Sequence, residues 1–558
     1  MYSRGEHENL SKRLIELLHH FPNSPILYNV QGALNASSGN IKLAESAYKN
    51  SLLMDPEYHA ARKNLGKLYL ELGDHTKAEQ QFNYLIEKSG EHEDGINGLA
   101  MISTNRGNSA KALTQYQKVL NLNPDNVIAL TNSANILYEQ GKIDSALTSI
   151  ERALNLSDGS PDLFGNLCSF LESSNKLHEL QILLDKPPYE HLRNSHEWTF
   201  YSGVLANRLG NNSTAIKILT GITPEVLTAR RQRQYHATIG RAAVECSLSQ
   251  VAMSAFEKMN SLIEKEAAGY QTKYSKERNE REEAKKRLGV LKGSKNTNIG
   301  VKSDTPPIFM VGFPRSGTTL LDTLLRGSDE VELIEEKPFV SAALKKALKL
   351  KIVDSPNPFT QEQKKILYEE YYRYISNFMG VKTPGKKIVD KLPLNIELIA
   401  FIYEVFNSPK IILSLRHPYD CILSCYFQNF ENNTAMSRMT SLSSIAIYYA
   451  EVMTHWLSAV EALNLDHIVI RYENLVEEPS KQLKDICEFL DIQFESDNFD
   501  NVTNAKSRNR INTPSYRQVG KPIYKSAINR WQQYESYLVE IREIIEPISA
   551  KLGYKTAF

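Results

Sequence analysis

One pattern of small and bulky positions recurs every 34 residues along the first part of the chain. Its glycines are Gly39, Gly73, Gly107 and Gly141, and its alanines are Ala44, Ala78, Ala112 and Ala146. Further small residues are Gly32, Gly66, Ala100 and Ala134, and bulky ones are Tyr48, Phe82, Tyr116 and Ile150. The pattern predicts antiparallel helix pairs, in which small residues permit close approach, glycine ends the first helix and the bulky side chain fills the gap.

Such a helix pair cannot bury its apolar face alone, so stacked neighbours must cover it and form an α-solenoid. The pattern resembles the tetratricopeptide repeat, with Pro56 and Pro124 at the expected end of the second helix. It weakens near Cys168 and then returns, which predicts about seven repeats and a solenoid domain over residues 1–262. We expect its surface to bind a protein or peptide, while a spacer or a dimerisation surface is the alternative.

Residues 264–292 are rich in Glu, Lys and Arg and contain no proline between Lys265 and Arg287. This composition predicts a solvent-exposed helix stabilised by pairs of charges four residues apart. The following stretch is rich in glycine, serine, asparagine and proline, which predicts a loop. We therefore expect a charged helical linker over residues 263–300 and a second domain over residues 301–558.

The second domain begins with an apolar run, Ile308–Val311, followed by a glycine loop and by leucines at helical spacing. A strand, a glycine loop and a helix together form a cradle of N–H groups for a phosphate. Gly312 and Gly317 have P-loop spacing, but Thr318 stands where a nucleotide hydrolase needs lysine, which argues against hydrolysis. Arg315 brings a cation into the loop instead. Taken alone, the loop is also consistent with an ordinary strand-to-helix turn.

A second motif follows the apolar run Ile411–Leu415, which predicts a strand that places Arg416 at its carboxyl end and Ser424 about two turns into a helix. Together with the run FPRSGTTLL, this motif resembles sulfotransferases that use 3′-phosphoadenosine-5′-phosphosulfate (PAPS). The resemblance implies an α/β P-loop-like domain with a parallel sheet. The cofactor-binding residues that it implies here are Pro314, Arg315, Ser316, Gly317, Thr318, Thr319, Arg416 and Ser424.

Most of residues 306–531 are similar to the tyrosylprotein sulfotransferases. That similarity implies that Glu336 is the catalytic base, that Lys391 stabilises the sulfuryl group together with Arg315, and that Ser515 is a catalytic serine. It also implies cofactor contacts from Tyr472, Lys521 and Arg530.

Some positions keep another interpretation. Gln428 stands where that family has an arginine near the 3′-phosphate, and Glu335 is a charged neighbour of the expected base. Glu336 is also consistent with a carboxylate that caps a helix, Lys391 with a surface lysine and Tyr472 with core packing.

The expected reaction is an in-line displacement in which an acceptor hydroxyl attacks sulfur and the 5′-phosphate leaves. A carboxylate removes the hydroxyl proton, and cations stabilise the charge on the bridging oxygen. No metal is expected. We predict transfer to a polypeptide tyrosine; sulfation of a saccharide or small metabolite, or a non-catalytic scaffold with a degenerate nucleotide-binding domain, are the alternatives.

Lys and Arg number 66 against 65 Asp and Glu, so the net charge of +1 gives no overall field for nucleic acid or for a membrane. Neither partner is expected. The charged opening segment lacks the apolar core of a signal peptide, no apolar run is long enough to span a bilayer, and the five cysteines fit free thiols, so we expect a cytoplasmic protein. Residues 501–534 carry seven cations and no acid, which fits a lid over the nucleotide or a site for an acidic acceptor.

In the repeat array, Asn64, Asn132 and Asn166 stand two positions before the small residue of their repeats. This arrangement resembles the asparagine ladder with which repeat-bearing glycosyltransferases hold a peptide backbone. The ladder is interrupted, since the equivalent positions are Val30, Gly98, Tyr201 and Thr238. An amide side chain can bond main-chain groups whatever the peptide sequence, so a peptide-binding groove is the hypothesis.

Overall fold

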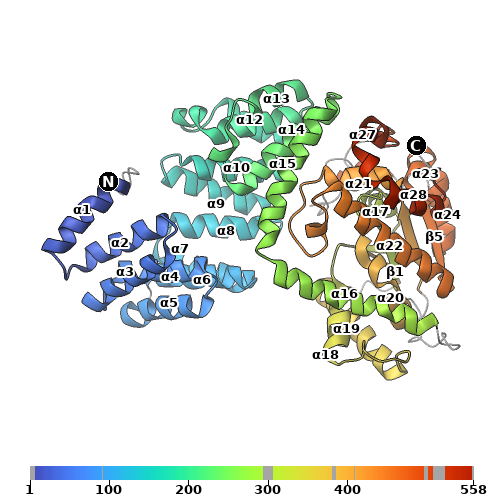
Figure 1. Ribbon diagram of the computed structural model, residues 1–558, viewed down its shortest axis with the longest axis horizontal. Coiled ribbons are helices and arrows are strands. Elements are labelled where there is room, and N and C mark those ends of the chain that lie inside the picture. Colours follow the sequence, from blue (N-terminus) through green and yellow to red (C-terminus); the bar gives the residue numbers. More distant parts are fainter. Residues whose placement is uncertain are drawn as a thin grey trace. The chain divides into compact units, whose positions relative to one another are not determined.

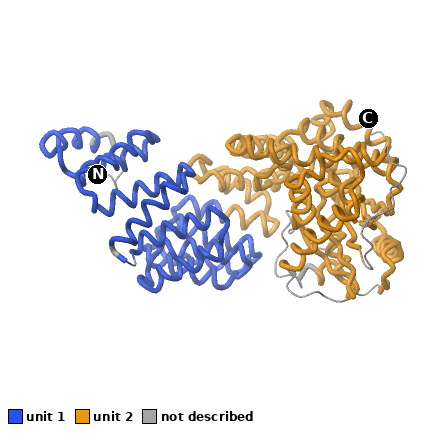
Figure 2. Tube along the Cα trace, turned by 90° about the horizontal axis from the view of Figure 1, so that it is seen from below, with its two compact units in different colours: residues 1–201 blue, residues 202–558 orange. Residues whose placement is uncertain are grey.

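The computed structural model describes residues 7–90, 92–292, 306–379, 385–406, 409–495, 500–506 and 522–555. The chain forms two compact units, residues 1–201 and 202–558 (Figure 2). The division falls within helix α12 (His196–Arg208). The domain boundaries expected at residues 262 and 300 stay predictions.

The first unit consists of helices in succession (Figure 1). They are α1 (His7–His20), α2 (Pro25–Ser37), α3 (Ile41–Met54), α4 (His59–Glu71), α5 (His75–Ser89), α6 (Glu93–Asn105), α7 (Ser109–Leu122), α8 (Val127–Glu139), α9 (Ile143–Leu156), α10 (Pro161–Ser173), α11 (Leu177–Asp185) and the start of α12, with the 3₁₀ helix η2 (Glu190–Asn194).

The small and bulky residues that recur every 34 positions explain how these helices pair. A Cβ atom at Gly66 would lie 2.7 Å from the ring of Phe82, so only a glycine lets α4 approach α5 this closely. The repeat glycine Gly39 has a φ of 74° just beyond the end of α2, which is the left-handed cap expected there. The predicted α-solenoid of tetratricopeptide repeats is therefore confirmed.

The second unit opens with the remaining helices of the array. They are α13 (Asn212–Leu219), η3 (Pro224–Val226), α14 (Ala229–Glu245) and α15 (Ser249–Ala268). In α14 and α15 the repeat geometry persists, because a Cβ atom at Gly240 would lie 2.6 Å from the ring of Phe256. Within the described chain, α2 to α15 therefore make seven successive helix pairs.

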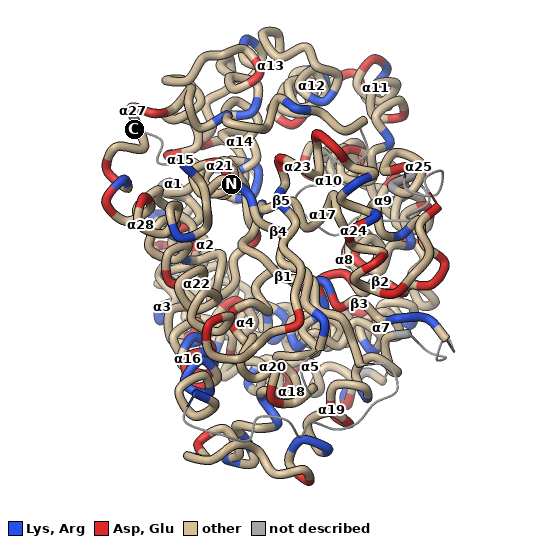
Figure 3. The backbone as a smooth tube through the Cα atoms, turned by 90° about the vertical axis from the view of Figure 1, so that its right-hand side faces the viewer, with Lys and Arg blue, Asp and Glu red and all other residues tan. Residues whose placement is uncertain are grey.

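The charged segment differs from the expected exposed helix. It is interrupted at Gly269 and Tyr270, and α16 (Gln271–Lys292) carries a buried arginine. Arg287 and Glu404 are each 1% exposed and pair across 2.8 Å, and Arg287 also donates to the carbonyl of Asn357. Helix α16 is thus packed into the second unit through Arg287, while Lys286 and Glu283 pair at its exposed surface, and both signs of charge occur along the helix (Figure 3).

The sheet has five parallel strands in the order β2-β3-β1-β4-β5. Strands β1, β4 and β5 lie side by side in Figure 3. The bounds are β1 (Ile308–Gly312), β2 (Val331–Glu335), β3 (Lys387–Lys391), β4 (Ile411–Leu415) and β5 (His467–Arg471). The predicted parallel α/β domain is confirmed.

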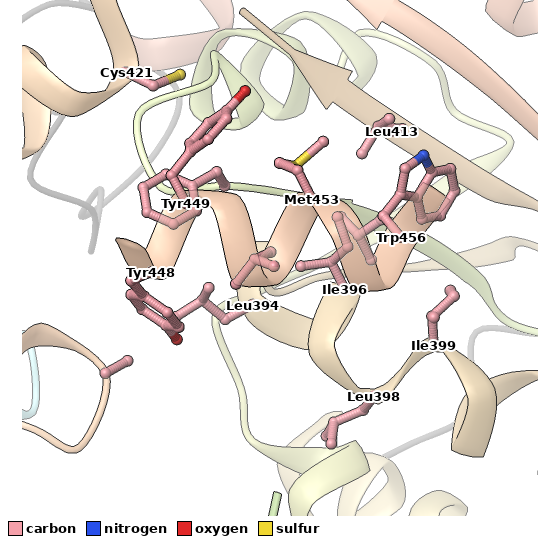
Figure 4. Packing of buried hydrophobic residues seen from close by; sticks show 14 of the residues in the cluster. Leu394, Ile396, Leu398, Ile399, Leu413, Cys421, Tyr448, Tyr449, Met453 and Trp456 are labelled. Carbon is pink, nitrogen blue, oxygen red and sulfur yellow. The ribbon is translucent and has the colours of Figure 1, made fainter. Parts of the chain in front are cut away.

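Alternate residues of these strands enter different cores. Val311 and Leu413 face one core with Tyr449, Met453 and Trp456 of α22 (Figure 4), whereas Met310 and Ile412 face the other. The helices around the sheet are α17 (Thr318–Leu325), α18 (Phe339–Lys349), α19 (Gln361–Met379), η4 (Pro393–Leu398), α20 (Ile399–Phe406), α21 (Pro418–Tyr426), η5 (Met436–Arg438), α22 (Leu442–Ala462), α23 (Tyr472–Glu477), α24 (Pro479–Leu490), α25 (Asn501–Lys506), η7 (Arg530–Tyr534), α27 (Glu535–Leu538), η8 (Val539–Ile541) and α28 (Arg542–Lys551). Among the described residues, none of the helices combines the length and apolar character needed to cross a bilayer.

Candidate functional site

The loop between β1 and α17 is shaped by two close approaches. A Cβ atom at Gly312 would lie 2.5 Å from the carbonyl oxygen of Ser414, and one at Gly317 would lie 2.8 Å from the ring of Tyr472. Gly317 also has a φ of 105° and caps α17, so its conformation suits glycine alone. The loop thereby directs the first N–H groups of α17, at Thr318 and Thr319, toward one point.

The two phosphate motifs meet in space. Arg315 Nε donates to Ser424 Oγ across 2.9 Å, although 109 residues separate them. Ser414 Oγ, at the end of β4, donates to the carbonyl of Ser316 across 3.0 Å. Cys425 Sγ lies 3.4 Å from the carbonyl of Pro314. Helix α21 and the loop therefore form one wall.

Arg416 extends this wall toward the chain's C-terminal segment. Its Nη1 donates to the carbonyl of Arg315 across 3.3 Å, and its Nη2 donates to the carbonyl of Ala527 across 2.5 Å. The guanidinium lies 4.7 Å from the ring centroid of Tyr472. Burial raises the pKa of Tyr472 to about 12, so the phenol stays protonated. Tyr472 begins α23, directly after the end of β5.

Asp420 was missed at the sequence level. Its carboxylate accepts from the backbone N–H groups of Asn529 and Trp531, each across 2.9 Å, and lies 3.8 Å from Arg416. These bonds hold Arg530, between those two residues, against α21. The spacing of four residues from Arg416 was the available signal.

Lys391, at the carboxyl end of β3, is surrounded by carboxylates. Its Nζ lies 3.1 Å from Glu336, 3.4 Å from Glu335 and 3.6 Å from Asp322. Lys391 and Asp322 are completely buried, which excludes the surface-lysine interpretation. Asp322, on α17, directly follows the run FPRSGTTLL but was not singled out in the sequence, because nothing local pairs it with Lys391, 69 residues later.

Glu336 differs from its neighbour Glu335 in exposure. The Glu336 side chain is 30% exposed and that of Glu335 only 7%. Burial raises the pKa of Glu336, and the charge of Lys391 opposes that rise. Glu336 also has a φ of 51°, an uncommon backbone conformation for this residue type. Its carboxylate is the accessible one of this cluster.

Two family comparisons agree with this geometry. Residues 306–496 match the model of the sulfotransferase family. Residues 31–92 and 104–161 match the tetratricopeptide repeat. The chain joins tetratricopeptide repeats to a sulfotransferase domain.

Individual relatives match about half of this chain at low identity. Protein-tyrosine sulfotransferase A of Caenorhabditis elegans is 24% identical over 283 residues, 47% of this chain and 70% of that protein. The protein-tyrosine sulfotransferase of Drosophila melanogaster is 23% identical over 45% of this chain and 52% of its own length. An uncharacterized protein of Aquifex aeolicus is 30% identical over 44% of this chain, but this chain spans only 33% of it.

Among solved structures, the sulfotransferase domain of the Synechococcus PCC 7002 olefin synthase has a TM-score of 0.34 and 19% identity, covering 46% of this chain and all of that domain. A tetratricopeptide repeat protein of Parabacteroides merdae has a TM-score of 0.34 and 15% identity, covering 43% of this chain and 93% of its own.

The residues of the sulfotransferase domain fit PAPS, the sulfuryl donor of sulfotransferases. In the described part of the chain, Ser316 Oγ and Arg416 Nε are buried without a hydrogen-bond partner. A buried donor without an acceptor is costly, and phosphate oxygens satisfy such donors. Ser515 and Lys521 lie outside the described residues.

Proposed function

We propose that the protein is a PAPS-dependent O-sulfotransferase that sulfates a tyrosine of a polypeptide held by the repeats. The contact between Arg315 and Ser424 carries the proposal, because it joins the two phosphate motifs into one site. The family match of residues 306–496 supports the same activity.

In this proposal, the loop residues Pro314, Arg315, Ser316, Gly317, Thr318 and Thr319 bind the 5′-phosphosulfate. Arg416 and Ser424 bind the 3′-phosphate, while Tyr472 and Arg530 border the nucleotide. PAPS, when bound, supplies the sulfuryl group and leaves as the 3′,5′-bisphosphate.

Glu336 removes the proton from the acceptor hydroxyl as attack proceeds, since its carboxylate is the exposed member of the cluster. Lys391 and Arg315 stabilise the negative charge that develops on the bridging oxygen. The carboxylates around Lys391 hold its ammonium in place. Ser515 and Lys521 keep their proposed roles as a catalytic serine and a cofactor contact.

The polypeptide acceptor is supported by the repeats, since arrays of this kind generally bind proteins, and by the names of the relatives. Incubation with radiolabelled PAPS and a fractionated host lysate tests it. We expect label on protein, recovered as sulfotyrosine after hydrolysis. Label confined to glycans or to small molecules would assign a different acceptor, and no label at all would reject the enzyme.

Nucleotide binding has its own test. We expect 3′-phosphoadenosine-5′-phosphate (PAP) to stabilise the protein against heat by about 2.7 kcal/mol at a hundredfold excess over its Kd. AMP, which lacks the 3′-phosphate, should stabilise it much less. Equal stabilisation by the two nucleotides would reject the roles of Arg416 and Ser424.

A further inference from the structure

The last helix pair of the repeat array holds the end of α21. Asn260 of α15 donates from Nδ2 to the carbonyl of Tyr426 across 3.0 Å, and Asn260 is only 2% exposed. The ring of Phe256, one turn earlier, stacks on Phe427 with centroids 4.4 Å apart. The first contact falls on the last residue of α21 and the second on the residue that caps it.

The same pair holds the segment that follows α21. Arg233 of α14 is buried, donates to the carbonyl of Phe430 across 3.5 Å, and pairs with Glu266 of α15 across 3.1 Å. Asn432 donates to the carbonyl of Ile263 across 3.3 Å. Helices α14 and α15 therefore also hold the segment that follows α21 in the chain.

Helix α21 and the residues just before it form much of the proposed nucleotide site. Ser424 lies two residues before Tyr426 and accepts from Arg315. Asp420, one turn earlier, accepts from the two N–H groups that flank Arg530. Phe427 also contacts the ring of Tyr534, at the end of η7, with centroids 5.2 Å apart. A shift of α21 would therefore move several proposed phosphate ligands together.

We propose that α14 and α15 are a positioning element of the nucleotide site and that Asn260 is a positioning residue for Ser424. This inference rests on the proposed function. The Tyr426 carbonyl is one of the last four of its helix, which have no partner within the helix. Asn260 is the donor that satisfies it in a buried setting, so its loss leaves the end of α21 free to shift.

The variant Asn260→Leu removes the donor and keeps the branched shape of the side chain. In the full chain, the Kd of PAP and that of AMP are measured by calorimetry, and their ratio reports recognition of the 3′-phosphate. We expect the preference for PAP to fall about three- to tenfold, the value of one hydrogen bond, with little change in the Kd of AMP. Mere loss of stability would not change this ratio.

The control is Arg287→Met, which breaks a buried contact of α16 with α20 and leaves in place the contacts of α14 and α15 with α21 that are described above. It should lower the melting temperature and leave the preference for PAP unchanged. If Asn260→Leu does not fold, Phe256→Leu is measured in the same way and should show the same loss of preference.

The outcomes separate the inference from the function on which it rests. A wild-type protein that binds PAP and AMP equally would overturn both. A wild-type protein that prefers PAP, with variants at Asn260 and Phe256 that keep the full preference, would overturn the positioning role alone.

Discussion

The Lys391 ammonium lies 3.1 Å from Glu336 Oε1, and the Glu336 N–H donates to the Lys391 carbonyl across 2.8 Å. This double contact joins the carboxyl ends of β2 and β3. It also holds Glu336 at a φ of 51°, a conformation that costs about 1–3 kcal/mol and persists where surrounding contacts enforce it. Such strain gathers at functional sites, which agrees with the base proposed here.

Glu336→Gln should lower turnover by about 10²–10⁴, because the amide keeps the size of the side chain but cannot accept the hydroxyl proton. The affinity for PAP should hardly change, since Glu336 lies outside the proposed phosphate contacts. Steady-state rates with labelled PAPS and calorimetric binding of PAP measure the two quantities.

The matched variant is Glu335→Gln, which alters the neighbouring carboxylate that also contacts Lys391. It should retain most of the turnover, because the Glu335 side chain is only 7% exposed. A crippled Glu335→Gln beside an active Glu336→Gln would place the base one residue earlier.

The pH profile should show the environment of Glu336. Burial raises its pKa, and the nearby charges of Glu335 and Asp322 raise it further, against the opposing effect of Lys391. The base works when deprotonated, so kcat/KM should rise with pH through a midpoint above the ordinary pKa of a glutamate. Glu335→Gln removes one like charge and should move that midpoint to lower pH. If this change did not move the midpoint, the rise of kcat/KM with pH would not report the ionisation of Glu336.

Asp390 predicts a pH-dependent stability. It is fully buried, accepts from Tyr371, and burial raises its pKa to about 7. The folded state then binds a proton that the unfolded state releases, so stability falls as pH rises through this pKa. The loss should be about 3 kcal/mol between pH 5 and pH 8. Urea unfolding at both values measures it, and Asp390→Asn should abolish most of the difference.

Arg287→Met should lower the free energy of unfolding by about 3–5 kcal/mol, because it leaves Glu404 buried without its ion pair. The exposed neighbour Lys286, paired with Glu283 on the surface of the same helix, provides the contrast. Lys286→Met should change stability by less than about 1 kcal/mol. Equal effects of the two changes would mean that α16 contributes only a solvent-exposed surface.

The sequence predicted the features that follow from local periodicity. The 34-residue pattern predicted the close packing of small on bulky residues that Gly66 and Phe82 show. The apolar runs predicted the bounds of β1 and β4 almost to the residue. Pairs between residues far apart in the sequence could not be predicted in this way. In the sequence, Arg287 is one of many charged residues of its helix, and only the fold brings it to Glu404, 117 residues away. Asp322 escaped for the same reason, because only the packing of α17 on β3 brings it to Lys391.

The asparagines of the repeat array provide the last prediction. Asn64, Asn132 and Asn166 lie on α4, α8 and α10, the first helices of their pairs, and each is only half-buried. Asn64 donates to Asn29 of the preceding pair across 2.9 Å, so amide side chains of successive repeats already meet. We hypothesise that these amides bond the backbone of the acceptor polypeptide.

Changing Asn64, Asn132 and Asn166 together to Ala should raise KM for a protein acceptor about tenfold or more, through the loss of several hydrogen bonds. Turnover and KM for PAPS should stay unchanged, because binding lost far from the reacting hydroxyl is lost equally from ground state and transition state. The control changes three exposed asparagines of the second helices, Asn50, Asn83 and Asn121, to Ala. If the control and the test variant have the same KM for the protein acceptor, the three asparagines of the first helices do not bind the acceptor.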